Sequence, residues 1–224
     1  MANQLAFLHT SPVHVATFDS LVRQADPSLR VDHHVREDLL ALARELGSEH
    51  PDVVRRVHEA MRAAAEAGAS LVVCTCSTIG GIAENMPGPT AFEAMRIDRA
   101  MADRAVRPGG VVLVVAALRS TVGPTLDLLR DSAHRLGARV ELVPLCVEEA
   151  WAFFERGDRT AYLQTIADAI TAATRSPSSR VSVVVLAQAS MAPVVDLLAG
   201  TTGVEVLASP RLGVAAALER IAGS

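Results

Sequence analysis

Short runs of β-branched and other apolar residues alternate along the chain with longer stretches in which apolar residues recur at helical spacing. The short runs predict strands at Leu5–Leu8, Leu29–Val35, Leu71–Cys76, Val111–Ala116, Arg139–Pro144 and Val181–Ala187. The longer stretches predict helices at Arg36–Leu46, Pro51–Gly68, Ala91–Arg107, Thr121–Gly137, Arg159–Arg175 and Pro210–Ile221. Several of the strands are apolar without alternation, which is typical of strands buried on both faces of a parallel sheet. The pattern therefore predicts an α/β fold built from βαβ units.

The two halves of the chain resemble each other in sequence. Residues 72–79 (VVCTCSTI) align with residues 184–191 (VVLAQASM), so that Cys76 corresponds to Gln188, 112 residues further on. Each segment is an apolar strand that ends in a small, polar turn able to open a helix. A shorter similarity pairs residues 17–21 with residues 125–129. The repetition predicts a duplicated architecture.

We therefore predict two pseudo-symmetric, Rossmann-like domains, each a mostly parallel sheet flanked by helices. The first comprises residues 1–95, the second residues 96–205, and residues 206–224 are expected to cross back to the first. Ligands of such folds bind at domain interfaces and at the carboxyl ends of parallel strands. We accordingly expect the active site in the cleft between the two domains.

Composition excludes several classes of function. All 21 Lys and Arg residues are Arg, so no lysine is present to form a Schiff base with pyridoxal phosphate or to serve a P-loop. The net charge of -4 and the aromatic content of 3% argue against a nucleic-acid partner. Three cysteines form no disulfide framework, and no apolar run approaches the length of about 20 residues that spans a bilayer. The sequence predicts a soluble cytoplasmic protein with no membrane partner.

Motifs for metals and nucleotide cofactors are also missing. Cys74 and Cys76 are not spaced as CxxC, and the adjacent His33 and His34 would point to opposite faces of a strand. The chain contains no HExxH, GxGxxG, P-loop or GxSxG sequence. We therefore predict neither a metal nor a cofactor.

The strongest local feature is the segment Leu71–Gly81. It places Cys76 at the end of a buried strand, followed by Ser77 and Thr78 as N-cap candidates and by Gly80-Gly81, where the backbone can approach a ligand closely. Free N–H groups at such a turn bind anions, and a carboxylate would suit them.

The two cysteines of this segment have different expected roles. The helix dipole is expected to lower the pKa of Cys76 and to favour the thiolate. Cys74 lies deeper in the strand and is expected to be a small buried apolar residue.

The first strand of each half ends in further candidate residues. Thr10 and Ser11 follow the first strand, and Ser120 and Thr121 follow its counterpart; their hydroxyls could contact a ligand or only cap the next helix. His9 has two interpretations, a second acid/base or a structural hydrogen-bonding residue. Arg96 or Arg99 could bind a second carboxylate of the substrate.

Four motifs resemble those of one enzyme family. They are the Cys76-Ser77-Thr78 turn after an apolar strand, the second turn at Leu186–Met191, the segment Arg96–Met101 and the closing segment Ala208–Gly213. In their order and spacing, these motifs are similar to those of the aspartate/glutamate/hydantoin racemase superfamily, and the resemblance covers most of the chain.

The resemblance implies an enzyme that acts on a small carboxylate substrate without cofactor or metal. One cysteine from each half faces the α-carbon; one thiolate removes the proton, and the other thiol returns a proton to the opposite face. Cys76 takes the place of the first cysteine, and Ser77 and Thr78 bind the carboxylate. The loops that hold Thr10, Ser11 and Thr121 would contribute hydroxyl contacts, and members of the family are often homodimers.

The chain departs from the family at the second cysteine, whose place is held by Gln188. A glutamine amide does not exchange a proton near neutral pH, so the mechanism with two bases lacks one partner. Gln188 would instead donate a hydrogen bond to a developing enolate, together with Ala189 and Ser190 of the same turn. Arylmalonate decarboxylases in this superfamily have a single cysteine, but theirs lies in the second half.

The leading hypothesis is a cofactor-independent isomerase of the racemase type. It would use Cys76 as the acid/base beside a carboxylate. Two alternatives remain open: a decarboxylase or cis-trans isomerase on the same scaffold, and a protein that binds small carboxylates without catalysis.

Overall fold

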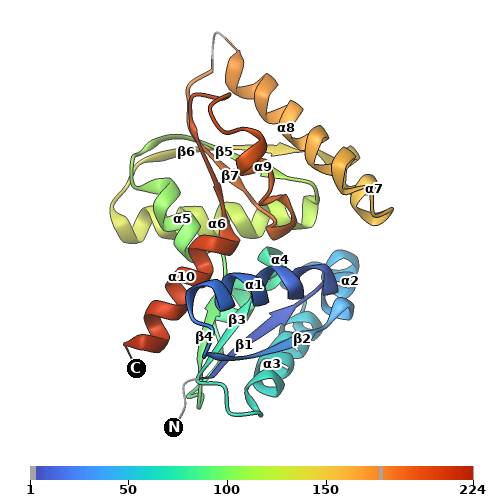
Figure 1. The fold of residues 1–224 in the computed structure, drawn as a ribbon, viewed down its shortest axis with the longest axis vertical. Helices are drawn as coiled ribbons and strands as arrows, with labels where there is room; N and C mark the ends of the chain where they lie inside the picture. The colour runs from blue at the N-terminus through green and yellow to red at the C-terminus, as the bar shows by residue number, and fades with distance from the viewer. Residues whose placement is uncertain (1–3, 177–178, 224) are drawn as a thin grey trace. The chain divides into compact units, whose positions relative to one another are not determined.

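The chain folds into two compact units (Figure 1). The structure is a computed structural model that describes residues 4–176 and 179–223. One unit contains the residues up to Arg99 and those from Pro210 onward, and the other contains Ala100–Ser209. Each unit is an α/β domain with its own sheet and its own hydrophobic core.

In the first unit, a four-stranded sheet has the order β2-β1-β3-β4. The strands are β1 (Gln4–His9), β2 (Arg30–Val35), β3 (Leu71–Cys74) and β4 (Glu93–Arg96). The helices are α1 (Val15–Ala25), α2 (Glu37–Leu46), α3 (Pro51–Ala65), α4 (Ser77–Glu84) and α10 (Ser209–Ala222), with a short 3-10 turn η1 (Pro12–His14). All pairings within this sheet are parallel.

In the second unit, the corresponding sheet has the order β6-β5-β7-β8 and is also parallel. Its strands are β5 (Gly110–Ala116), β6 (Val140–Cys146), β7 (Val181–Leu186) and β8 (Glu205–Ala208). The helices are α5 (Arg99–Val106), α6 (Arg119–Leu136), α7 (Glu148–Glu155), α8 (Arg159–Arg175) and α9 (Val194–Leu197), with a 3-10 turn η2 (Ala189–Met191). The two strand orders are equivalent, which confirms the predicted pair of similar α/β domains.

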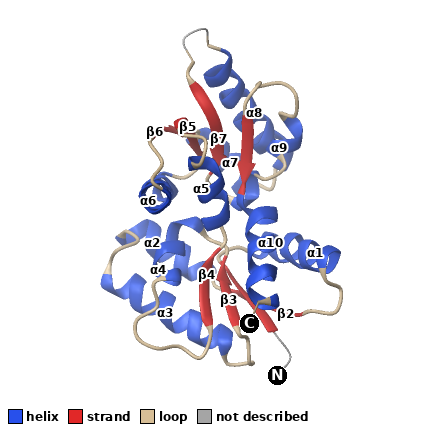
Figure 2. Ribbon diagram, turned by 90° about the vertical axis from the view of Figure 1, so that its left-hand side faces the viewer, coloured by secondary structure: helices blue, strands red, loops and turns tan. Residues whose placement is uncertain are grey.

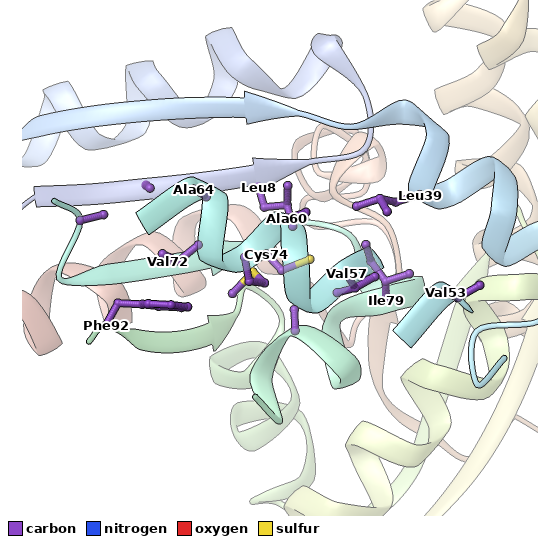
Figure 3. Close-up of a cluster of buried hydrophobic side chains, with 14 of the residues drawn as sticks. Leu8, Leu39, Val53, Val57, Ala60, Ala64, Val72, Cys74, Ile79 and Phe92 are labelled. Carbon is purple, nitrogen blue, oxygen red and sulfur yellow. The ribbon is translucent and has the colours of Figure 1, made fainter. Parts of the chain in front are cut away.

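Helices cover both faces of each sheet (Figure 2). In the first unit, α2, α3 and α4 lie on one face, and α1 and α10 lie on the other. The apolar residues of α3 recur every three to four positions, and Val53, Val57, Ala60, Met61 and Ala64 are buried. They pack against Leu8, Val72 and Cys74 of the central strands (Figure 3). Cys74 is thus a core residue, as the sequence predicts.

Three predicted elements need correction. The helix predicted at Ala91–Arg107 is wrong at its start, because Glu93–Arg96 forms β4, which pairs with β3 at the sheet edge, and α5 begins only at Arg99. The predicted strands Leu71–Cys76 and Val181–Ala187 end earlier, at Cys74 and Leu186, because the chain leaves the sheet to enter a helical turn. The predictions also lack α1, α7, α9 and β8, whose sequences have few fully buried positions.

Gly213 of α10 provides a test of the packing in the first unit. A Cβ at this position would clash with the carbonyl oxygen of Ile97, and a backbone oxygen cannot move aside as a flexible side chain can. We expect Gly213→Ala to lower the free energy of unfolding by about 2–3 kcal/mol, although alanine is the better helix former. The melting temperature should fall by roughly 5–10 °C.

The control is Ala215→Gly at an exposed position of the same helix, where helix propensity alone should lower the free energy of unfolding by about 0.5–1 kcal/mol. Thermal and urea unfolding would measure both variants. A Gly213→Ala protein as stable as the wild type would contradict the close approach of α10 to Ile97.

Candidate active site

Cys76 stands at the N-cap of α4, two residues after the end of the central strand β3. Its backbone is extended, with φ -99 and ψ 115, and the helix starts at the next residue. The neighbouring strands hold the strand end in place, because the N–H of Thr75 donates to the carbonyl of Leu8 (3.0 Å) and the N–H of Ile97 donates to the carbonyl of Cys74 (3.0 Å). Cys76 is partly exposed, whereas Cys74 is buried. The fold therefore presents a single cysteine at the carboxyl edge of this sheet.

The pKa of the Cys76 thiol is raised above its ordinary value. Burial is the main cause, and it outweighs four hydrogen-bonding contacts that act in the opposite direction: those from the Thr10 side chain, from the backbone N–H groups of Ile79 and Thr78, and from the Thr78 side chain. The two N–H groups point toward the sulfur without forming a regular capping hydrogen bond. The predicted lowering of the pKa is wrong, because loss of hydration exceeds the effect of the helix terminus. At rest and near neutral pH, Cys76 is a thiol.

Thr10 and Ser11, which follow β1, have different surroundings. Thr10 is buried, and its hydroxyl reaches the Cys76 thiol. Ser11 is the N-cap of η1, and its side chain forms no capping hydrogen bond. The structure therefore brings Thr10 together with Cys76 and shows no such contact for Ser11.

Ser77 and Thr78 occupy the first two positions of α4, so the prediction that they cap the helix is wrong; Cys76 occupies the capping position itself. The Ser77 hydroxyl donates to the carboxylate of Asp98, and the Thr78 side chain contacts Cys76. Both residues are buried. Their side chains are thus engaged within the turn.

The glycines of α4 lie close to the side chain of Arg96. A Cβ at Gly80 would lie 3.2 Å from Nε of Arg96, and a Cβ at Gly81 would lie 3.4 Å from its Nη1. Gly80 therefore makes room for the buried guanidinium of Arg96, whereas a Cβ at Gly81 would lie at an ordinary contact distance.

The two arginines considered for a second substrate carboxylate already have carboxylate partners. Arg96 forms two hydrogen bonds with Asp98, from Nε to Oδ1 at 2.6 Å and from Nη2 to Oδ2 at 3.1 Å. Arg99 is bonded to Glu84, with 3.1 Å between Nε and Oε1. Burial opposes the charge of Asp98, but Arg96 and the hydrogen bonds hold the pKa of this carboxyl below its usual range. Both arginines are therefore structural partners within the first unit.

Gln188 occupies the position in the second unit that Cys76 occupies in the first. It is the N-cap of η2 and follows β7 by two residues, with φ -126 and ψ 138. Its Oε1 accepts a hydrogen bond from the N–H of Ala117 at 2.6 Å. Because a backbone N–H can only donate, this contact fixes the orientation of the amide. The carbonyl end of Gln188 is engaged, and the NH₂ group is the end left to donate.

The other candidates of the second unit lie in the first turns of its helices. Ala189 and Ser190 begin η2, and the Ser190 hydroxyl lies 2.8 Å from the hydroxyl of Tyr162, which is 1% exposed. Thr121 is buried in the first turn of α6, whose N-cap is Leu118, so neither Ser120 nor Thr121 caps this helix.

Sequence reasoning missed Tyr162. Burial raises its pKa to about 12, so it is a neutral phenol that can hydrogen-bond with Ser190 at any physiological pH. The only signal in the sequence is that it is the single tyrosine of the chain.

His9 is fully buried and has both ring nitrogens engaged. Nδ1 lies 2.9 Å from the Thr75 hydroxyl, and Nε2 lies 2.9 Å from Nδ1 of His33. Burial, reinforced by the neighbouring His33, lowers its pKa to about 3. Of its two interpretations, the structure favours the hydrogen-bonding one, because a neutral ring without a free nitrogen is poorly suited to proton transfer.

Comparison with known proteins gives matches in structure only. No protein-family model matches the sequence, and no curated protein matches it. An aspartate racemase from Picrophilus torridus superimposes with a TM-score of 0.73 at 13% identity, over 99% of this chain and 95% of the other. A glutamate racemase from Bacillus anthracis gives 0.68 at 12% identity, over 99% and 82%. A variant of an arylmalonate decarboxylase gives 0.61 at 16% identity, over 99% and 94%.

The chain has the fold of the aspartate/glutamate racemase superfamily. The resemblance inferred from short motifs is thus confirmed at the level of fold.

Among residues 4–176 and 179–223, no group of three or more His, Cys, Asp or Glu side chains is arranged to hold a metal ion. Within the same residues, no helix combines the length and apolar character needed to cross a membrane.

Proposed function

We propose that the protein is a cofactor-independent enzyme of the racemase type, which uses the Cys76 thiol as an acid/base at the carbon next to a carboxylate. The observation that carries the proposal is the position of Cys76: a partly exposed cysteine at the N-cap of α4, in a chain with the racemase fold. The absence of lysine from the sequence supports chemistry without pyridoxal phosphate.

The surroundings of Cys76 support proton transfer in both directions. Because burial raises its pKa, the resting thiol is a proton donor. When that proton passes to solvent, Thr10 and the N–H groups of Thr78 and Ile79 stabilise the thiolate, which can then take the α-proton of the substrate. The electron pair of the broken C–H bond passes to the substrate carboxylate as an enolate, and the thiol returns the proton to the same carbon. A positioned acid/base of this kind accelerates such a step by about 10² to 10⁴.

Because Gln188 stands where the second acid/base would be, the proposed proton transfer takes place on only one face of the substrate α-carbon. Its amide neither accepts nor releases a proton near neutral pH, and its carbonyl is held by Ala117. We propose that its NH₂ group, with Ala189 and Ser190, donates hydrogen bonds to the developing enolate, each donor contributing about 2.7–4 kcal/mol. Thr10, Ser11, Ser77, Thr78 and Thr121 complete the proposed substrate-binding set. The expected reaction is proton exchange with retention of configuration.

Decarboxylation is a second candidate, favoured by the protonated resting state of Cys76 and by the fold shared with an arylmalonate decarboxylase. Loss of CO₂ from a malonate leaves an electron pair on the α-carbon, and the Cys76 thiol would protonate that carbon. The resulting thiolate regains its proton from water. Release of CO₂ from substituted malonates would distinguish this reaction from exchange at an amino acid.

Incubation in D₂O tests the proposal. The wild type would be supplied with amino acids, hydantoins and dicarboxylates, and exchange of the α-proton and chirality would be followed by NMR and chiral chromatography. Exchange with retained chirality supports the one-sided thiol mechanism. Racemisation would show that a group other than Gln188 serves as the second acid. Ligands that raise the melting temperature without any exchange or CO₂ release would favour a binding protein.

The variant Gln188→Cys should add racemisation to exchange. It places a thiol at the position equivalent to Cys76, so that protons can be delivered from a second residue. Chiral chromatography of a substrate that the wild type exchanges would detect the opposite enantiomer. Gln188→Ala is the matched control, which removes the donor but supplies no acid. Equal enantiomer formation by the two variants would contradict the assignment.

We also propose that the protein is a cytoplasmic homodimer whose partner is a small carboxylate-containing substrate. Light scattering of the purified protein would measure the oligomeric state, and a mass equal to one chain would contradict the dimer.

A further inference from the structure

The segment Arg96–Arg99 lies against α4, the helix whose N-cap is Cys76. Arg96 and Asp98 are 4% and 1% exposed, and their two hydrogen bonds form a bidentate ion pair. Burial of two opposite charges requires that their remaining hydrogen-bonding groups find partners. Those partners lie in the Cys76 turn.

Ser77, the residue after Cys76, is bonded to both members of the pair. Nη2 of Arg96 donates to the Ser77 carbonyl at 3.4 Å, and the Ser77 hydroxyl donates to the Asp98 carboxylate. The pair thus contacts one residue through its backbone and through its side chain. These contacts restrict both the position and the rotation of the first turn of α4.

Two further features fix the packing of α4 against the segment Arg96–Arg99. Gly80 leaves space for the Arg96 guanidinium, and a Cβ there would approach its Nε to 3.2 Å. At the other end of the helix, Arg99 is paired with Glu84, the last residue of α4. The same short segment therefore holds α4 at both ends.

Stability alone gives a poor account of the buried pair. Replacement of buried ion pairs by apolar residues of similar volume is often neutral or stabilising, because desolvation offsets the attraction. Apolar residues could fill this space, but they could not form the directional bonds to Ser77.

The chain also contains an exposed pair with the same spacing, Arg36 and Asp38, with hydrogen bonds of 2.8 and 2.7 Å.

We propose that Arg96 and Asp98 are positioning residues, which fix the Cys76-Ser77 turn and hold the thiol in its partly buried place. The proposal rests on the proposed function in that Cys76 is taken as the reactive group. Neither Arg96 nor Asp98 is assigned a contact with the substrate.

The first experiment compares Asp98→Asn with Asp38→Asn, the same change in an exposed pair of equal spacing. Alkylation of Cys76 by iodoacetamide would be measured between pH 7 and 10 by peptide mass spectrometry. Release of the turn admits water to the thiol, so Asp98→Asn should raise the alkylation rate at pH 8 by about fivefold or more and shift the profile to lower pH. Asp38→Asn should behave as the wild type. An unchanged profile in folded Asp98→Asn would overturn the proposal.

A second variant separates positioning from stability. Asp98→Asn leaves an unpaired buried cation and could fail to fold, whereas the double variant Arg96→Met with Asp98→Leu buries no charge. We expect the double variant to melt within a few degrees of the wild type and still to show the altered alkylation profile. A folded double variant with the wild-type profile would overturn the proposal. A double variant that does not fold would show that the pair is needed for folding, and would overturn it too.

The alkylation measurement does not depend on turnover, so the two proposals can fail separately. An altered profile in the variants of a wild type that has no activity would leave the positioning role intact and contradict only the proposed function. An unchanged alkylation profile in the variants of an active wild type would contradict the positioning role and leave the proposed function intact.

Discussion

Replacement of Cys76 by alanine should lower the rate of α-proton exchange or decarboxylation by about 10² to 10⁴, the contribution of a positioned acid/base. The loss should appear in kcat rather than in KM, because the thiol acts on the reacting proton and the proposed hydrogen-bond donors that bind the carboxylate are retained. Turnover of the substrate found in the D₂O experiment would measure it. A variant with full turnover would remove Cys76 from the mechanism.

Two other substitutions serve as controls for Cys76→Ala. Cys146→Ala removes a partly exposed thiol at the end of β6, in the other unit, and should leave turnover unchanged. Cys76→Ser keeps a hydrogen-bonding group beside Thr10 but replaces an acidic thiol by a hydroxyl that does not ionise near neutral pH. Its activity should therefore fall as far as that of Cys76→Ala, which separates proton transfer from hydrogen bonding.

The fold was predictable where burial dominates the sequence pattern. All residues of β1 and β3 are buried, and their continuous apolar runs predict interior parallel strands. The edge strand β4 has only Met95 and Arg96 buried, and the helical pattern that follows obscured it. The helix α1 buries only Phe18 and Val22, so its apolar face is too narrow to stand out.

The candidate site was predictable at the ends of strands and not beyond them. Thr10 and Cys76 both follow neighbouring parallel strands, which places them at one sheet edge. The contacts that set their properties depend on tertiary structure. The partners Gln188 and Ala117 are 71 residues apart, and Tyr162 and Ser190 are 28 residues apart. No local sequence pattern indicates such pairs. The direction of the Cys76 pKa shift depends on burial, which only the fold creates.

His9 should make the protein sensitive to acid. Thr75 donates its hydroxyl proton to the Leu8 carbonyl at 3.3 Å, so it accepts from Nδ1 of His9. Nε2 of His9 then accepts from His33. A second proton on the buried His9 ring would have to displace that hydrogen bond. Its pKa of about 3, compared with 6.5 in an unfolded chain, follows from burial first and from His33 second.

The direction of the pH dependence follows from this difference. Below pH 6.5 the unfolded chain binds a proton at this histidine that the folded chain does not bind, so stability falls as the pH falls, down to about pH 3. One such group changes the free energy of unfolding by at most about 1.4 kcal/mol per pH unit, or roughly 3–5 kcal/mol over the whole window. Urea unfolding from pH 7 to pH 4 would measure the slope. His9→Gln should be less stable at pH 7, and the slope of its free energy of unfolding against pH should be smaller by the equivalent of about one proton. His134→Gln, at an exposed position of α6, should keep the wild-type slope. Equal slopes for His9→Gln and the wild type would show that the His9 ring is not held neutral in the folded protein.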